Sequence, residues 1–388
     1  MITRMRSDEP HDQPHDEHHD ERDAWPTPRT LIGADYHSPE VFARERERIF
    51  HASWFCVGRE DDIAIGGFVV VDVVGESVVL VRDRDGMLRA FLNACRHRGA
   101  RLCDGDGSVG RRIVCPYHAW SYNLDGSLAG TPNVADDELV DRASLGLMSV
   151  ALDSWDGFVW VTLADDPPPL RDHLAHHASG DPFQWERYGV GELVLGAKRV
   201  YDVAANWKLI IENYNECLHC VNVHPELVQI VPLYKSGDVI EPTEPDWNGN
   251  RLAPGLHSYT LTGESGLPLL PGLDENDATA FYGGTYLPNL IINYHTDCVS
   301  TFLISPQAPD RSQVTCHYLF RPETVAAAGF DPSPVVDFRH LLAGQDWAVV
   351  ERTQQGMTSR AFRDGGVLPY NDRYVHAFHE RYRALRDG

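Results

Sequence analysis

The sequence has no long hydrophobic run. In 388 residues there is no stretch of 18 apolar residues, and the most apolar segment, GFVVVDVVGESVVLVRD, is interrupted by Asp72 and Glu76. A membrane-spanning helix needs about 20 such residues, so this segment is interpreted as strands. The N-terminus, MITRMRSDEPHDQPHDEHHDERD, also lacks the apolar core of a signal peptide. These absences predict a cytoplasmic protein with no membrane span.

Basic residues are also scarce. The chain has 34 Lys and Arg against 57 Asp and Glu, a formal net charge of −23. Nucleic-acid binding depends on clustered positive charge, so the composition argues against this function. The chain carries no glycine-rich dinucleotide fingerprint after a strand and no plant-type ferredoxin run C-x₄-C-x₂-C. A nicotinamide, flavin or ferredoxin part is therefore expected on another chain.

Residue patterns divide the chain into four segments. Residues 1–30 are predicted to form a disordered acidic and His-rich tail, with weak metal binding by its histidines as the alternative. Residues 31–55 have helical spacing and are expected to pack on the larger domain. Residues 56–165 contain Val- and Phe-rich strands with turn residues between them, which predicts a small antiparallel β domain. Residues 166–388 mix strands and helices, so the fold class is α+β, with an antiparallel sheet covered by helices in the larger domain.

The small β domain contains two mixed Cys/His pairs. In CRHRGARLCDGDGSVGRRIVCPYHAW, Cys95-x-His97 is followed by seventeen residues and then Cys115-x-x-His118. Two Cys and two His could hold zinc or a [2Fe–2S] cluster. Classical zinc fingers pair Cys with Cys, whereas each loop here offers one of each. Cys103 fits neither pair and is interpreted as a bystander.

A second cluster of polar residues stands in ENYNECLHCVNVH, residues 212–224. Asn206 is a plausible N-cap, and the residues at helical spacing after it predict an apolar stripe; they are Trp207, Ile210, Ile211, Tyr214, Leu218 and Val221. On one continuous helix Glu212, Glu216 and His219 would share a neighbouring face. For His224 to meet His219 at one metal, the helix must end or distort near residues 221–223. Cys217 and Cys220 are interpreted as buried thiols.

A distant carboxylate could complete this second site. Asp346 opens the helical stretch GQDWAVVERTQQG. Two His and one carboxylate form the facial triad of non-haem Fe(II) sites, which leaves positions open for O₂ and substrate. The alternatives are an ordinary helix N-terminal aspartate for Asp346 and a solvated glutamate for Glu216.

The two clusters together resemble the Rieske non-haem iron oxygenases, the catalytic alpha subunits of ring-hydroxylating dioxygenases and related monooxygenases. The resemblance runs from YHSPEVFARERERIFHASW to NDRYVHAFHERYRAL. It implies a homotrimer that takes NAD(P)H electrons through a separate flavin- or ferredoxin-type reductase. It also implies Glu216 as the bridge to a neighbouring subunit's cluster. The implied ligands are Cys95, His97, Cys115 and His118 for the [2Fe–2S] cluster, and His219, His224 and Asp346 for a mononuclear Fe(II).

The form ENYNECLHCVNVHPEL, with Glu216 and Cys220, resembles the branch acting on choline, glycine betaine, carnitine and stachydrine. That branch hydroxylates or demethylates a carbon beside nitrogen, and an aromatic cage would bind the cation. Candidate cage residues in FYGGTYLPNLIINYH are Phe281, Tyr282, Tyr286 and Tyr294, with ordinary core packing as the alternative. An aromatic-ring or natural-product hydroxylase is the second expectation. A Rieske electron carrier with an inactive second domain is the third.

Overall fold

A computed structural model describes residues 22–135, 141–179, 184–239, 250–274 and 277–388. The described strands pair antiparallel in every ladder, and helices cover one of the larger sheets. The predicted α+β class, with a small β domain and a larger helix-covered sheet, is confirmed. Most of the predicted tail, residues 1–21, lies outside the described residues.

The first sheet is built by the N-terminal part of the chain and has the strand order β1-β10-β9-β4-β3-β2-β5. Successive side chains of the strand over residues 76–82 belong to two different core clusters, Val78 and Leu80 to one and Val79 and Val81 to the other, as the period of two along a strand requires. Its strands are β1 (Phe55–Arg59), β2 (Gly67–Val73), β3 (Glu76–Arg82), β4 (Leu88–Leu92), β5 (Asp106–Ser108), β9 (Ser149–Trp155) and β10 (Phe158–Thr162).

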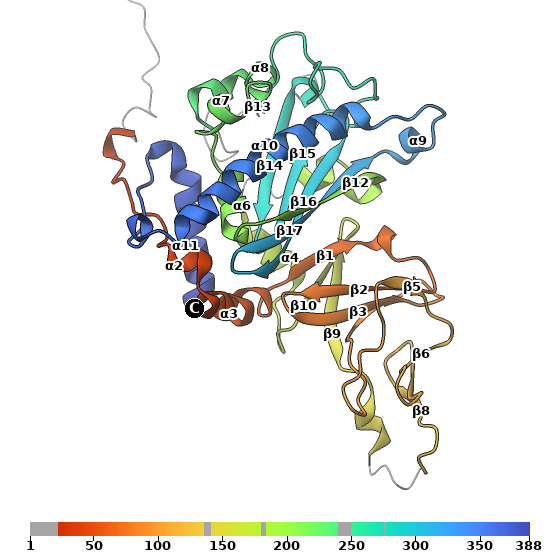
Figure 1. Cartoon of the computed structure of the whole chain (residues 1–388). Coiled ribbons are helices and arrows are strands. Elements are labelled where there is room, and N and C mark those ends of the chain that lie inside the picture. Colours follow the sequence, from red (N-terminus) through yellow and green to blue (C-terminus); the bar gives the residue numbers. More distant parts are fainter. Residues whose placement is uncertain (1–21, 136–140, 180–183, 240–249, 275–276) are drawn as a thin grey trace, which may run out of the picture.

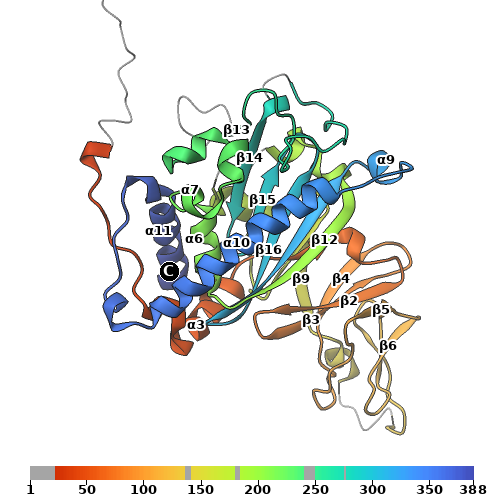
Figure 2. The same ribbon diagram turned by 45° about the horizontal axis from the view of Figure 1, so that its top comes forward.

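A small three-stranded sheet extends from this domain. It consists of β6 (Arg112–Val114), β7 (Ser121–Asn123) and β8 (Leu128–Gly130). Figure 1 places β6 and β8 at the tip of the molecule farthest from α7 (Cys220–Val223), and the turned view in Figure 2 again has β6 and α7 on opposite sides. The loop after β4 and the loop between β6 and β7 carry the two Cys/His pairs.

The second sheet has the order β11-β14-β15-β16-β17-β12, and β13 pairs with β14. Its strands are β11 (Ala178–Ser179), β12 (Val194–Val203), β13 (Asn250–Arg251), β14 (Ala280–Tyr286), β15 (Leu290–Tyr294), β16 (Val299–Ala308) and β17 (Arg311–Phe320). The 25-residue helix α10 (Ser333–Met357) crosses one face of this sheet, and α6 (Trp207–Tyr214) lies beside it (Figures 1 and 2). The remaining described α-helices are α2 (Ala34–His37), α3 (Pro39–Glu45), α4 (Leu170–His177), α5 (Gln184–Arg187), α8 (Leu227–Ile230), α9 (Pro322–Val325) and α11 (Arg373–Asp387).

A buried ion pair fastens α3 to α6. The Lys208 ammonium lies 2.6 Å from Oε1 of Glu45, and neither side chain is exposed. The same carboxylate accepts hydrogen bonds from Trp207 Nε1 (3.0 Å) and the Tyr382 hydroxyl (2.6 Å). Burial lowers the pKa of Lys208, and Glu45 opposes that shift. One carboxylate thus joins the N-terminal helix, α6 and α11.

For residues 22–30 the structure differs from the predicted disordered tail. Trp25 donates from Nε1 to the carbonyl of Leu368 at 2.9 Å, and its ring packs edge-on against Tyr370. Arg29 forms an isolated β-bridge with Val367. The charged composition of the N-terminal tail predicted a solvated, disordered segment. In residues 22–30, however, the contacts of Trp25 and the β-bridge of Arg29 attach the chain to residues 367–370.

No helix in the described ranges combines the length and apolarity that crossing a membrane would require.

Candidate metal centres and active-site cavity

Helix α6 ends earlier than its apolar pattern indicated. It covers Trp207–Tyr214, and the Asn206 side chain caps it by accepting from the Lys208 amide at 3.0 Å, as predicted. The chain then breaks before the short helix α7, so the helical phase is lost. Leu218 and Val221, expected in the buried stripe, are 41% and 45% exposed. The predicted helix end near residues 221–223 is present, because α7 ends at Val223, and the break after Tyr214 is a second interruption that the sequence pattern did not indicate.

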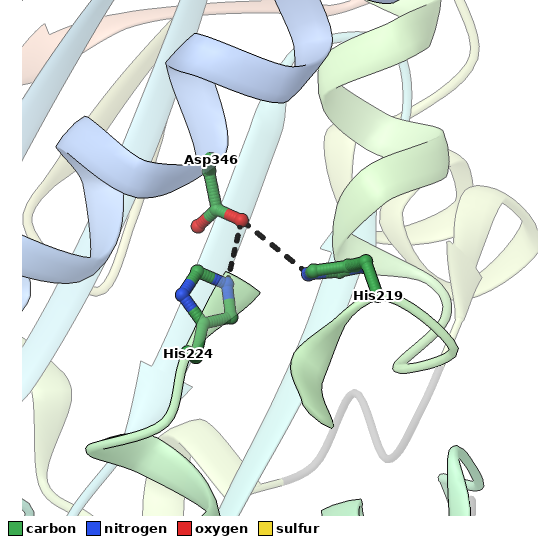
Figure 3. Close-up of side chains that lie close together, drawn as sticks. All are labelled: His219, His224 and Asp346. Carbon is green, nitrogen blue, oxygen red and sulfur yellow. Dashed lines mark hydrogen bonds and ion pairs between the residues drawn. The ribbon is translucent and has the colours of Figure 1, made fainter. Parts of the chain in front are cut away.

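This break lets two histidines from one segment face α10. Asp346 Oδ1 lies 2.8 Å from Nε2 of His224 and 3.4 Å from Nε2 of His219 (Figure 3). One possible ligand atom from each of these residues lies within 4.8 Å of the others, and this is the one such group among the residues that the structure describes. The two imidazoles and one carboxylate predicted from the sequence are thus brought together.

The outer nitrogens of both imidazoles are held by neighbouring oxygen atoms. His219 Nδ1 lies 2.5 Å from Oε1 of Glu216, and His224 Nδ1 lies 2.7 Å from Oε1 of Gln345. Gln345 in turn donates from Nε2 to Glu226 at 3.0 Å. In a neutral imidazole these acceptors favour the tautomer with the proton on Nδ1, which leaves the Nε2 lone pair for a metal ion; a protonated imidazole donates from Nε2 to Asp346 instead. The donor set therefore fits a divalent metal ion.

The ionisation of His219 and Asp346 reflects the same arrangement. Burial alone would lower the pKa of His219, yet hydrogen bonds to Asp346 and Glu216 raise it to about 9. Burial would raise the pKa of Asp346, and the hydrogen bonds from His219 and His224 outweigh it, so the pKa is lowered. The site thus stabilises positive charge at the place where a cation would sit.

Glu212 and Asn213, which precede His219 in the same segment, have different surroundings. Glu212 accepts from the Tyr36 hydroxyl at 2.7 Å and lies 2.9 Å from His379 Nε2. It therefore ties α6 to α2 and α11 rather than facing the metal ligands. Asn213 lies with its Nδ2 atom 3.4 Å from His219 Nε2 and lines the cavity described below.

The interpretation of Cys217 and Cys220 as free thiols is wrong. Both side chains are buried, as expected, but a disulfide joins them across a Cα–Cα distance of 5.0 Å. That separation lies within the usual range for a disulfide. The Cys-x-x-Cys spacing of Cys217 and Cys220 was the available signal for this disulfide.

The four residues of the Cys/His pairs are arranged asymmetrically. Cys95 and Cys115 are buried, whereas His97 lies exposed and His118 half-buried. The two imidazole rings are 4.7 Å apart between centroids. This arrangement suits a [2Fe–2S] cluster whose Cys-bound iron is shielded and whose His-bound iron faces outward.

Neighbouring aromatic residues brace the same loops. His97 stacks on Trp120 with ring centroids 4.7 Å apart. The Tyr122 hydroxyl accepts from the Arg96 amide and lies 3.2 Å from Sγ of Cys95. A hydrogen bond to a ligating sulfur is one of the factors that set a cluster's potential. Cys103 is a free cysteine.

A cavity of about 180 Å³ opens beside the His219, His224 and Asp346 cluster. Of the four predicted cage residues, Phe281 alone belongs to its lining. Tyr282, Tyr286 and Tyr294 lie in a separate core cluster, where Tyr282 donates to Asp277 at 2.8 Å. Side chains alternate along β14, and Tyr282 pairs in register with Tyr294, so these rings point to the opposite face.

Other aromatic residues take the place of those three tyrosines. The cavity lining includes Tyr214, Tyr234, Tyr259, Phe302, Trp347 and Tyr374. Trp347 follows Asp346 directly, and Tyr214 precedes His219 by five positions, so nearness to the predicted ligands was an available signal. For Tyr234 and Tyr259 the sequence carried no signal of a place in the cavity, because their segments meet β14 only in the folded chain.

Comparison with known proteins agrees with this geometry. Residues 190–388 match the family model "Ring hydroxylating alpha subunit (catalytic domain)", and residues 53–149 match "Rieske [2Fe-2S] domain". The glycine betaine monooxygenase oxygenase subunit of Chromohalobacter salexigens is 30% identical, covering 87% of this chain and 81% of the relative. The carnitine monooxygenase oxygenase subunit of Escherichia coli K12 is 29% identical, covering 89% and 88%.

Solved structures share the fold. A quaternary ammonium Rieske monooxygenase in complex with L-carnitine matches with a TM-score of 0.72 at 23% identity, over 93% of this chain and 96% of the other. Naphthalene 1,2-dioxygenase from Rhodococcus sp. matches with a TM-score of 0.71 at 23% identity, over 92% and 94%.

The fold and the two sites define a protein that pairs a Rieske [2Fe–2S] domain with an oxygen-activating catalytic domain. The chain belongs to the ring-hydroxylating alpha subunit family and is a Rieske non-haem iron oxygenase. The third expectation, a Rieske electron carrier with an inactive second domain, is thereby rejected.

Proposed function

We propose that this oxygenase hydroxylates a C–H bond beside the quaternary nitrogen of a small, betaine-like substrate. The observation that carries the proposal is a single cavity lined both by His219, His224 and Asp346 and by several aromatic rings. In this proposal the three residues bind Fe(II). When bound, the iron supplies the activation of O₂. Gln345 and Glu216 hold the two imidazoles in the orientation that ligation requires.

Two features of the cavity support a small cationic substrate. The rings of Phe281, Tyr214 and Trp347 offer π faces, which attract a quaternary ammonium group. The volume of about 180 Å³ is below the roughly 300–1,000 Å³ of typical ligand pockets. A compact substrate suits this space better than a polycyclic ring system. The similar glycine betaine and carnitine monooxygenase subunits support the same substrate class.

The position of Glu216 supports a head-to-tail homotrimer. Its carboxylate holds His219, and its side chain is 16% exposed, so one oxygen can accept from a residue of another subunit. Within one chain the Cys/His loops and α7 lie on opposite sides of the molecule (Figure 2). Electron transfer weakens steeply with distance, so a cluster of a neighbouring subunit is the better donor. A ring of identical interfaces would place such a cluster at every site.

The electrons are proposed to come from NAD(P)H through a separate flavin- or ferredoxin-type reductase. The chain has no dinucleotide fingerprint of its own. The purified protein with NADH alone should therefore consume no NADH, and consumption by the pure chain would contradict the need for a reductase. The cytoplasmic location expected from the N-terminal composition stays a prediction.

The test is a substrate panel with iron-loaded protein and a surrogate reductase. Hydroxylation of an N-methyl group takes up one O₂, two electrons and two protons, releases water, and gives a carbinolamine that collapses to formaldehyde and the tertiary amine. Attack at the other carbon on nitrogen releases trimethylamine and an aldehyde. We expect one of these product pairs with glycine betaine, carnitine or γ-butyrobetaine and none with naphthalene or anthranilate. Turnover of the aromatic compounds alone would overturn the proposal.

A further inference from the structure

Arg339 is a buried cation in the wall of the active-site cavity. It is 6% exposed and lies on α10, seven residues before Asp346. Seven residues make about two turns, so both side chains project from the same face of the helix. Both line the cavity that holds the candidate iron ligands. The positive charge therefore belongs to the substrate's surroundings.

Arg339 differs from the other buried cations of the described residues in having no ion pair. Lys208 is paired with Glu45 at 2.6 Å, and Arg59 lies 3.5 Å from Asp61. Across the described ranges no carboxylate lies within ion-pair distance of Arg339, and its Nε atom is buried without a hydrogen-bond partner. Buried charges are ordinarily paired, because an isolated one loses its hydration without compensation.

The contacts that Arg339 does make leave its charge uncompensated. One Nη2 hydrogen is donated to Nε2 of His295, and the guanidinium lies 4.6 Å from the centroid of the Tyr259 ring. Burial and the charge of Arg339 lower the pKa of His295 well below its usual value, so this ring is neutral. Asp297, a buried acid two residues after His295, accepts from the Ser258 hydroxyl at 2.6 Å and forms no ion pair with Arg339. The guanidinium thus keeps donors and a full positive charge.

We propose that Arg339 binds a carboxylate of the substrate and so selects zwitterionic betaines over purely cationic compounds. The ammonium half of this inference rests on the function proposed above. A substrate carrying the cation alone would add a second positive charge to a small cavity that already holds Arg339. A betaine brings the missing counter-ion, and a guanidinium can bind a carboxylate through two parallel hydrogen bonds. Arg339 is in this sense a specificity-determining residue.

Three ligands with the same chain length between the trimethyl group and the carboxyl carbon separate the effects of the two charges. γ-Butyrobetaine carries both, its methyl ester carries the cation alone, and 5,5-dimethylhexanoate replaces the nitrogen by carbon and carries the carboxylate alone. Binding to the iron-loaded oxygenase is measured by isothermal titration calorimetry without a reductase. We expect the ester to bind about 10- to 100-fold more weakly than γ-butyrobetaine, which is the range of a charge-assisted hydrogen bond in a buried site.

The Arg339→Gln variant should weaken the binding of γ-butyrobetaine by the same factor, whereas the binding of the cationic ester should not weaken. Arg339→Lys, which keeps the charge, should restore part of the preference for the acid. Arg199→Gln on β12, whose side chain is 49% exposed, is the control and should change neither affinity. The ligand series on the unchanged protein decides the question even if Arg339→Gln does not fold.

The outcomes distinguish the two proposals. Equal affinity of the ester and the acid for the unchanged protein would overturn the role of Arg339 and leave the proposed function standing. Binding of 5,5-dimethylhexanoate as tightly as γ-butyrobetaine, lost in Arg339→Gln, would support the role of Arg339 and overturn the quaternary ammonium substrate. Failure of all three to bind would overturn both.

Discussion

Asp346 Oδ1 and His224 Nε2 lie 2.8 Å apart although 122 positions separate the two residues in the chain. Asp346 comes from the long helix α10 and His224 from the segment after α7 (Figure 3). One core cluster contains Cys220 of α7 and Leu342 of α10. The contact between Asp346 and His224 joins the two halves of the candidate iron site.

Replacing Asp346 by Ala should remove one of three proposed ligands and release the mononuclear iron. We expect iron per chain to fall from about three to about two, with the visible [2Fe–2S] spectrum unchanged and product formation abolished. Iron analysis, absorbance and product assays check this. Asp337→Ala lies on the same helix with its carboxylate 67% exposed and should behave like the unchanged protein. Product formation by Asp346→Ala would rule out the proposed ligand set.

Replacing Glu216 by Gln should preserve both metals and slow electron transfer between them. The amide keeps a hydrogen-bond acceptor for His219 but removes the negative charge of the proposed bridge. Single-turnover kinetics of the pre-reduced protein should show a rate at least about tenfold lower, equivalent to about 1.4 kcal/mol in the barrier. Glu212→Gln, which contacts Tyr36 and His379 instead, is the control. A single-turnover rate equal to that of the unchanged protein would contradict the bridge.

Phe281 and Tyr282 are neighbours on β14 that face opposite sides of the sheet. Phe281→Leu removes an aromatic face from the cavity and should raise KM for a quaternary ammonium substrate by about 3- to 30-fold. Tyr282→Phe removes the hydrogen bond to Asp277 and should lower stability by about 1 kcal/mol with KM unchanged. Steady-state kinetics and thermal unfolding compare the pair. A raised KM in Tyr282→Phe and an unchanged KM in Phe281→Leu would place the substrate on the face of the sheet that carries Tyr282.

The Lys208–Glu45 pair predicts a large effect on stability from a residue outside the cavity. Lys208→Met leaves the Glu45 carboxylate buried without its cation and should destabilise the protein by about 3–5 kcal/mol. Adding Glu45→Gln removes the stranded charge and should recover part of the loss. Lys198→Met, at an exposed position of β12, is the control. Denaturation midpoints followed by circular dichroism test the series, and equal midpoints for Lys208→Met and Lys198→Met would contradict it.

His173 should make the protein sensitive to mild acid. Burial, and then the neighbouring His177, lower its pKa from 6.5 to about 4. A group whose pKa is depressed on folding stabilises the fold above its unfolded pKa, and this contribution is lost as pH falls from 6.5 toward 4. Between pH 7.5 and 5 the loss amounts to about 2 kcal/mol.

Thermal midpoints at these two pH values are the measurement. His173→Gln should reduce the difference between the thermal midpoints at the two pH values. His257→Gln, at a side chain that is 60% exposed, should leave that difference unchanged. A pH dependence that is the same in both variants would show that His173 does not titrate in this range.

Local patterns predicted some features well. The two Cys/His pairs, the N-cap at Asn206 and the period-two strands depend on residues close together in the chain, and the structure has them where the sequence indicated. The same patterns were misleading where a tertiary contact competes with helical periodicity. Leu218 and Val221 continue the apolar spacing of α6, yet the chain turns after Tyr214 so that His219 and His224 can both reach Asp346.

The sequence by itself determined which residue types carry the chemistry, because the two Cys/His pairs and the histidines of the second site stand at short spacings in contiguous segments. Asp346, 122 positions from His224, meets them only in the folded chain. The tertiary structure decided what surrounds that chemistry. Tyr234, Tyr259 and Arg339 join Phe281 around one cavity, while Tyr282 and Tyr294 turn away from it. Which face of a strand becomes a cavity wall depends on the segments that pack against it from far along the chain, and no local pattern carries that information.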